Sequence, residues 1–202
     1  MLKENQEYKR NWRRFIIFTL VVGLIVGIFS VISDNLPIIV DDVTVLEFVI
    51  SYLAIMINSL PMWFILAMLV GYVFSSNIKE AVLLGVIYTV TAITFYFVIG
   101  YFYTDIPFPI SIKERAVDYM SWVVGSVVGG FFGGSVGFLV KKTPYALLIP
   151  FVGIIFQLFL YGTSSWGDIV GISQNVTFCL MIVSIVFYIM IVKRKKELNW
   201  GT

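Results

Sequence analysis

The chain has 202 residues, of which 59% are hydrophobic and 13% are charged, and its formal net charge is +2. Soluble domains average about 45–50% apolar and about 25% charged residues, so this composition indicates a membrane protein and excludes an ordinary soluble domain. There is no histidine, and Cys179 is the one cysteine. An intrachain disulfide, a thiolate cluster and a histidine metal site are therefore excluded, and we expect no metal and no cofactor.

Apolar runs long enough to cross a bilayer, which takes about 18 or more residues, recur along the chain. The first, 15–32, follows the basic segment 1–14. No small-residue cleavage site comes after this run, which favours an uncleaved span over a signal peptide. The sequence predicts an all-α membrane protein with six transmembrane helices, forming a single polytopic transmembrane domain over 1–202. The later runs lie at 61–76, 79–103, 116–140, 144–162 and 171–192.

A further apolar segment, Thr44–Ser59, is short for a full crossing. Lysine and arginine gather at the cytoplasmic ends of membrane helices. With six crossings, every basic residue except Lys113 and Arg115 lies on the side of both termini. A seventh crossing would move Lys79 and the basic tail 193–202 to the wrong side. We therefore expect cytoplasmic termini in a bacterial cell membrane. Thr44–Ser59 is then re-entrant, interfacial or a kinked extension of the second span.

The fourth span carries two rows of small residues, each repeating every four positions. In lipid, helices associate by close packing, and glycine lets backbones approach one another. The rows predict a packing groove, for which Gly23 and Gly27 of the first span are a candidate partner face. The functional alternative is a flexible gating helix or a slot for a flat ligand or lipid. The glycines of the groove are Gly125, Gly129, Gly130, Gly133, Gly134 and Gly137.

A polar break precedes the second span. Asn58 and Ser59 come before Pro61, an order typical of a helix cap followed by proline in the first turn. If the break lies below the outer headgroups, its exposed amides would favour an anionic or strongly polar guest, as in the broken helices of transporters. A capping turn at the interface is the simpler interpretation.

Three other polar residues stand close to or within apolar runs, where polar groups are costly and informative. Glu47 and Asp118 are carboxylates at the edge of the apolar region, and each either binds a cationic group or faces water. Gln157 lies deep in the fifth span and either makes a helix-to-helix hydrogen bond or contacts a ligand.

Aromatic residues gather toward the outer ends of the spans, where an aromatic belt at headgroup level is expected. Trp63 and Trp122 stand out because each begins a span beside a polar break. We consider these two tryptophans candidate walls of a pocket.

The sequence offers no machinery for catalysis. It contains no histidine, no paired carboxylates at helical spacing within one span, and no glycine-rich loop with the lysine of a nucleotide site. The basic residues sit where membrane topology alone requires them, so we expect no nucleic-acid binding. We expect a protein that is not an enzyme.

Two stretches resemble an uncharacterised bacterial family of six-span membrane proteins. They read "MINSLPMWFILAMLVGYVFSSNIKEAVLLGVIYTVTAITFYF" and "SWVVGSVVGGFFGGSVGFLVKK". The resemblance covers about 50–162 and implies six spans, with no activity that could be carried over. A looser architectural similarity is to the substrate-capturing S components of energy-coupling-factor transporters. They have about this length, six spans, and a small-residue pattern in the first span like that of Gly23 and Gly27.

These features favour a non-enzymatic subunit with an outward-facing pocket for a small molecule or lipid, seated in the lipid bilayer. A separate membrane protein, docked on the glycine-rich face, would supply the energy for transport. The alternative is a membrane interaction protein, such as an immunity factor or an assembly subunit, with no ligand pocket. The candidate ligand-binding residues are Glu47, Asn58, Ser59, Trp63, Asp118, Trp122 and Gln157.

Overall fold

The structure is a computed structural model that describes residues 2–36, 44–103 and 112–200. Seven α-helices and two short 3-10 helices account for nearly all of this part of the chain, which contains no strand. The α-helices are α1 (Leu2–Asp34), α2 (Val45–Ile57), α3 (Leu60–Phe74), α4 (Ile78–Tyr103), α5 (Ile112–Lys142), α6 (Leu148–Tyr161) and α7 (Ile169–Trp200). The 3-10 helices are η1 (Pro144–Leu147) and η2 (Ser164–Trp166).

Five of the helices, α1, α4, α5, α6 with η1, and α7, are long and apolar enough to cross a membrane. The pair α2 and α3 passes the same test as one bent span, which brings the number to six. The prediction of an all-α membrane protein with six spans is confirmed in these terms. The single domain over 1–202 remains a prediction, and residues 1 and 201–202 of its basic ends lie outside the described residues.

The segment that the sequence left open is a helix of its own. α2 leads into α3 through Asn58 and Ser59 with a bend of 65°. α3 alone is about 22 Å long, less than the roughly 30 Å of a hydrocarbon core. Because α2 is inclined by 65°, it adds about 8 Å along the direction of α3. The bent pair together has the length of one crossing.

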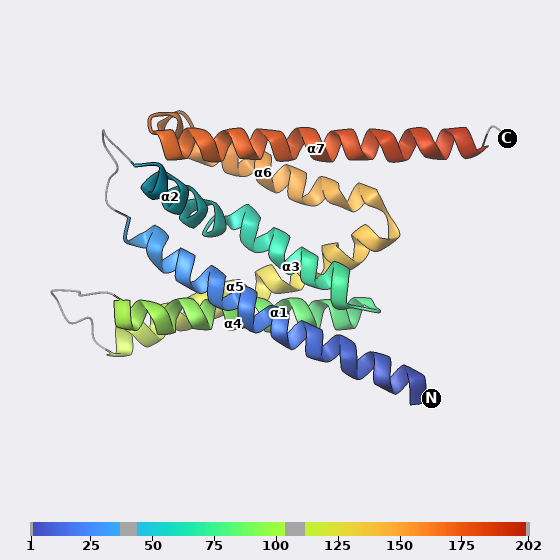
Figure 1. The fold of residues 1–202 in the computed structure, drawn as a ribbon, viewed down its shortest axis with the longest axis horizontal. Coiled ribbons are helices and arrows are strands. Elements are labelled where there is room, and N and C mark those ends of the chain that lie inside the picture. The colour runs from blue at the N-terminus through green and yellow to red at the C-terminus, as the bar shows by residue number, and fades with distance from the viewer. Residues whose placement is uncertain (1, 37–43, 104–111, 201–202) are drawn as a thin grey trace.

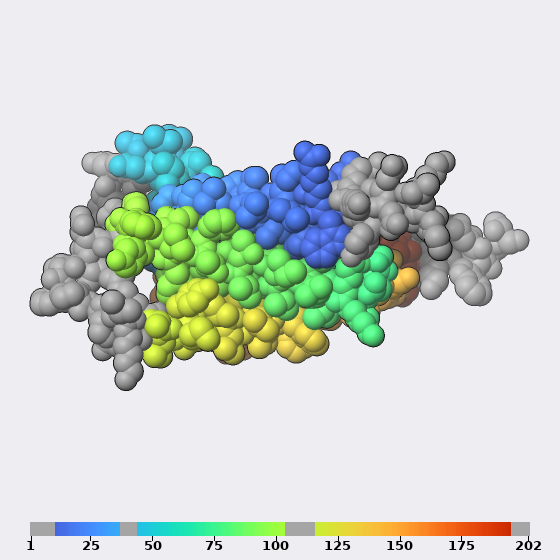
Figure 2. Space-filling view, turned by 90° about the horizontal axis from the view of Figure 1, so that it is seen from below, coloured from blue at the N-terminus to red at the C-terminus, as the bar shows by residue number. Residues whose placement is uncertain are grey.

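Both chain ends lie at the same end of the molecule (Figure 1). That arrangement is the one that an even number of crossings produces. Seen from below, α4 lies between α1 and α5, and the three helices form one continuous surface (Figure 2).

The helices pack as two groups. One apolar core joins α1, α3 and α4 around Phe15, Val70 and Tyr88. A smaller core joins α2, α6 and α7 around Met56, Ile154 and Phe178. In Figure 1, α5 and α6 diverge from their connection near η1, so that α5 stays with the first group and α6 goes with α7. The two groups therefore separate along the space between α5 and α6.

The C-terminal half of α5 is held by glycine contacts with two helices. Gly133 and Gly137 lie against Ala67 and Met68 of α3, since a Cβ atom on either glycine would overlap them. Gly134 lies against Gly71 of α3 and against the backbone of α4. Gly130 is in similarly close contact with α4 at Gly85 and Thr89. These four glycines are thus covered within the chain, so they form no free docking face for a partner protein.

Two expectations about the groove differ from the structure. Gly23 and Gly27 pack on α4, where a Cβ atom on Gly27 would come within 2.9 Å of Phe95 Cβ, and not on α5. The physical reason is that α4 lies between α1 and α5 (Figure 2). Gly125 and Gly129 make no helix contact, because a Cβ atom on either meets nothing within 4 Å. The row of Gly125 and Gly129 is therefore open, whereas the row of Gly130 and Gly134 continues against α4 as far as Ser126, whose carbonyl accepts from Thr89 Oγ1 at 2.7 Å.

Candidate ligand cavity

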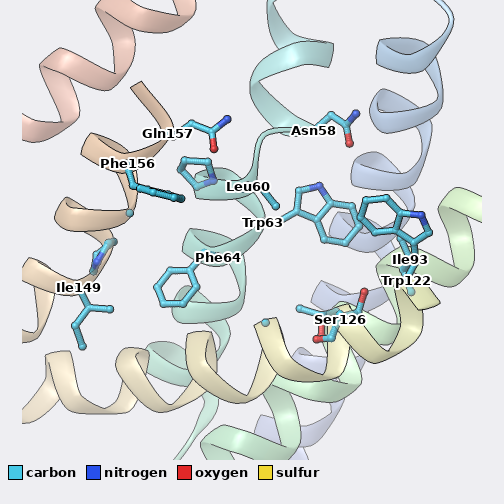
Figure 3. Close-up of a pocket in the computed structure, with 16 residues that line it drawn as sticks. Asn58, Leu60, Trp63, Phe64, Ile93, Trp122, Ser126, Ile149, Phe156 and Gln157 are labelled. Carbon is cyan, nitrogen blue, oxygen red and sulfur yellow. The ribbon is translucent and has the colours of Figure 1, made fainter. Parts of the chain in front are cut away.

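A cavity of about 720 Å³ lies where the two helix groups separate. It is bordered by the break between α2 and α3, by α4 and α5 on one side, and by α6 on the other (Figure 3). Its volume falls in the range of small-molecule sites. The accessible surface of its lining is predominantly apolar, and no charged side chain among the described residues contributes to it.

Glycines on opposite walls provide much of the space. Gly125 and Gly129 line the cavity from α5, and Gly153 lines it from α6. At each of the three, an added Cβ atom would find open space. The same small residues that elsewhere bring helices together here leave a gap between them.

Gln157 is a polar residue in the lining of this cavity, near the end that Asn58 borders. Its side chain is 6% exposed, and it makes no hydrogen bond to any residue that the structure describes. The amide is not fully enclosed by protein atoms, which leaves it open to the cavity. Figure 3 shows the amide among the lining residues, on the wall formed by α6. Its donors and its acceptor are thus available to a molecule in the cavity.

Asn58 closes α2 and borders the outer end of the cavity. Its Nδ2 donates to Asp34 Oδ1 at 3.1 Å, and Tyr96 Oη donates to Asp34 Oδ2 at 2.5 Å. Asp34 is the last residue of α1, and Tyr96 belongs to α4. The carboxylate therefore connects three elements at the mouth of the cavity.

Both predicted wall tryptophans line the cavity. Trp63 contributes from the first turn of α3 and Trp122 from the outer part of α5. Trp122 has 58% of its surface exposed, so its indole stands at the opening.

Ser59 does not line the cavity, although it is buried. It is the N-cap of α3: its Oγ accepts from Met62 N at 3.4 Å and donates to the Met56 carbonyl at 2.6 Å. Trp63 N donates to the Ser59 carbonyl, and Pro61 has no N–H group. The first turn of α3 is therefore a capped helix start, as the simpler interpretation of the sequence expected.

Glu47 and Asp118 lie away from the cavity. Glu47 forms a capping box with Thr44 at the start of α2, where its carboxylate accepts from Thr44 N at 2.9 Å. Asp118 is exposed near the outer end of α5. The structure thus brings Asn58, Trp63, Trp122 and Gln157 together and leaves Glu47, Ser59 and Asp118 outside.

Sequence reasoning missed most of the apolar lining, and it also missed Gly153 in that lining and the two residues that hold Asn58, Asp34 and Tyr96. Gly153 is a lone glycine in the fifth span, with no repeat to mark it. Asp34 and Tyr96 belong to spans that are far apart in the sequence, and only the fold brings them to Asn58. The sequence feature that could have pointed to Asp34 is its position at the end of an apolar run, where a carboxylate lies at the membrane surface.

Comparison with known proteins gives no relative. No family model matches the chain, and neither a curated protein nor a solved structure matches it. What the structure has in common with the six-span family and with the S components is its all-helical set of apolar spans.

Proposed function

We propose that this protein is a binding subunit of the membrane that accepts a small apolar molecule or a lipid into the cavity between α3, α5 and α6. The observation that carries the proposal is Gln157, a residue that is 6% exposed and whose amide has no hydrogen-bond partner among the described residues, on the wall of a cavity of about 720 Å³. An unpartnered amide within a membrane span is expensive, and its placement is explained by a ligand that completes its hydrogen bonds.

The apolar lining supports a ligand that comes from the bilayer. Opposed glycines on α5 and α6 leave space between the two walls, and α6 exposes the large apolar side chain of Phe156, a lining residue, beside the opening. A molecule with an apolar body could thus enter sideways from the lipid. Binding here requires no catalytic group, and we propose that the protein is not an enzyme.

The wider setting is also part of the proposal. We place the protein in a bacterial cytoplasmic membrane with both termini inside, because the basic residues gather at that end of the spans. Any energised transport would require a separate protein. That protein would have to use a surface other than the four glycines that α3 and α4 cover. Membership of the uncharacterised six-span family, or of the S components, belongs to the proposal too.

The proposal is tested by asking which small molecules stay with the purified protein. The protein is extracted into native lipid nanodiscs, and bound species are quantified by mass spectrometry. Gly153→Phe places a ring inside the cavity, where it competes for space with a bound species and should displace it. Val152→Phe adds the same ring to the lipid-facing side of the same helix, where the side chain is 62% exposed, and should leave it in place.

Equal occupancy in both variants, or no bound species in the unmodified protein, would contradict the proposal. Recovery of a stoichiometric protein partner with an empty cavity would instead favour the alternative role of an interaction protein.

A further inference from the structure

We propose that the outer end of the cavity recognises a cationic hydrogen-bond donor, an ammonium group, on an amphipathic ligand whose apolar chain occupies the rest of the cavity. This inference rests on the proposed function and adds the chemical class of the ligand. Four observations carry it: the orientation of Asn58, the charge around it, the state of the α3 N-terminus and the apolar depth of the cavity.

The orientation of the Asn58 amide is fixed by Asp34. Both oxygens of Asp34 accept a hydrogen bond, Oδ1 from Asn58 and Oδ2 from Tyr96, as an ionised carboxylate does. A carboxylate cannot donate, so the NH₂ group of Asn58 has to face it, and the Oδ1 atom of Asn58 has to face elsewhere. In Figure 3 this oxygen is turned toward Trp63. The outer end of the cavity thus presents an acceptor, which requires a donor on the ligand.

The charges around Asn58 favour a positively charged donor group on the ligand over a neutral one. Asp34 places a negative charge one hydrogen bond away from the acceptor, and no lysine or arginine among the described residues lines the cavity to offset it. Trp63 and Trp122 border the same end, and the face of an indole attracts cations. Asp34 acts here as a positioning residue, since it holds Asn58 and does not itself line the cavity.

The helix N-terminus beside the cavity offers few free donors to a competing anion. A helix start attracts anions through its free N–H groups. In α3 the Met62 N–H donates to Ser59 Oγ, the Trp63 N–H donates to the Ser59 carbonyl, and Pro61 has no N–H. The N–H of Leu60 is the one donor of this turn that remains without an acceptor among the described residues. The expectation of an anionic guest at this break, which the sequence left open, is therefore disfavoured.

The remainder of the cavity suits an alkyl chain. From Gln157 to Ile149, both in its lining, α6 spans about 12 Å. Over this length the cavity is bordered by Phe64, Gly129 and Gly153 and carries no charge. Gln157, near the polar end, can donate to or accept from a second polar atom of the headgroup.

The test uses three probes with the same alkyl chain and different heads: decylamine, decanol and decanoate. Each is titrated at neutral pH into nanodiscs that contain the intact protein, and the probe bound per protein is measured by mass spectrometry. Gly153→Phe nanodiscs give the background from partition into the bilayer. We expect decylammonium to bind about tenfold more tightly than decanoate, with decanol in between.

Asp34→Asn should reduce the preference for decylammonium over decanoate to about twofold, because it removes the charge and frees the Asn58 amide to turn over. Asp118→Asn removes an outer carboxylate that does not contact Asn58 and should leave the ratio unchanged. Tyr96→Phe, which takes away the second donor that holds Asp34, should lower the ratio in the same direction and serves if Asp34→Asn does not fold.

The outcomes separate the two proposals. Binding of decanoate as tight as that of decylammonium, or a ratio unaffected by both Asp34→Asn and Tyr96→Phe, would overturn this inference and leave the binding function standing. If no probe exceeds the Gly153→Phe background, the inference and the proposed function both fail.

Discussion

Gly134 of α5 lies so close to Ala81 of α4 that a Cβ atom on the glycine would overlap the Ala81 carbonyl. Nine residues earlier, Gly125 lies on the same helix with nothing within 4 Å of such an atom. One helix therefore uses the same amino acid for two purposes: contact between helices in its C-terminal half and open space in its N-terminal half.

The two glycines should respond to alanine with opposite signs. Gly134→Ala forces α4 and α5 apart, and we expect it to lower the free energy of unfolding by about 1–3 kcal/mol. Gly125→Ala adds a methyl group to open space and a better helix former, so it should raise the free energy of unfolding by up to about 1 kcal/mol. Thermal unfolding of both variants in the same detergent checks the difference.

Gly129→Ala is the matched control, because its added methyl group also lies in open space. It should behave as Gly125→Ala does. A lower melting temperature for Gly125→Ala and Gly129→Ala, equal to that of Gly134→Ala, would mean that α6 closes onto α5 and that the cavity is absent.

Replacement of Gln157 should stabilise the protein and abolish binding. Gln157→Leu removes a buried amide that has no partner among the described residues, so we expect a gain of about 1 kcal/mol in the empty protein. The same change removes the polar contact offered to a ligand. Opposed effects of this kind are typical of functional sites.

The measurement combines thermal unfolding with occupancy by mass spectrometry. If Gln157 made a helix-to-helix hydrogen bond instead, Gln157→Leu would lower the melting temperature, and this result would remove the main support for the site.

The hydrogen bond between Tyr52 and Thr177 is expected to hold α2 to α7. Tyr52 Oη and Thr177 Oγ1 are 2.6 Å apart and join helices at opposite ends of the chain. Tyr52→Phe should cost about 0.6 kcal/mol, the average for hydrogen bonds between membrane helices. A double-mutant cycle with Thr177→Val isolates this bond, and strictly additive effects would show that the two side chains do not interact.

The span count and part of the close packing were accessible from sequence because both depend on local patterns, although Gly125 and Gly129 were wrongly included in the packing face. Runs of apolar residues bounded by charge set the spans, and a four-residue glycine repeat marked one face of α5. Which neighbour uses that face could not be predicted, since Gly23 and Gly27 have the same local pattern and pack on a different helix. Packing partners depend on the arrangement of all the helices, which no single repeat contains.

The candidate site was accessible in part for a similar reason. Asn58, Trp63, Trp122 and Gln157 stood out because polar and indole groups within apolar segments are conspicuous. Glu47 was equally conspicuous, yet its carboxylate is used locally to cap α2. Asp34 was not singled out, because its role depends on a contact with Asn58, 24 positions away, that only the bend between α2 and α3 creates.

The side of the membrane on which each end lies can be tested by cysteine labelling in intact cells. In a Cys179→Ala background, Ser164→Cys places a thiol in η2, at the end of the molecule opposite the two termini. Lys142→Cys places one at the other end, where α5 stops. Basic residues mark the cytoplasmic side, so we expect a membrane-impermeant maleimide to label Ser164→Cys in intact cells and Lys142→Cys only after the membrane is opened. Labelling with the opposite pattern would turn the mouth of the cavity toward the cytosol, and the ligand would then have to come from the inner leaflet.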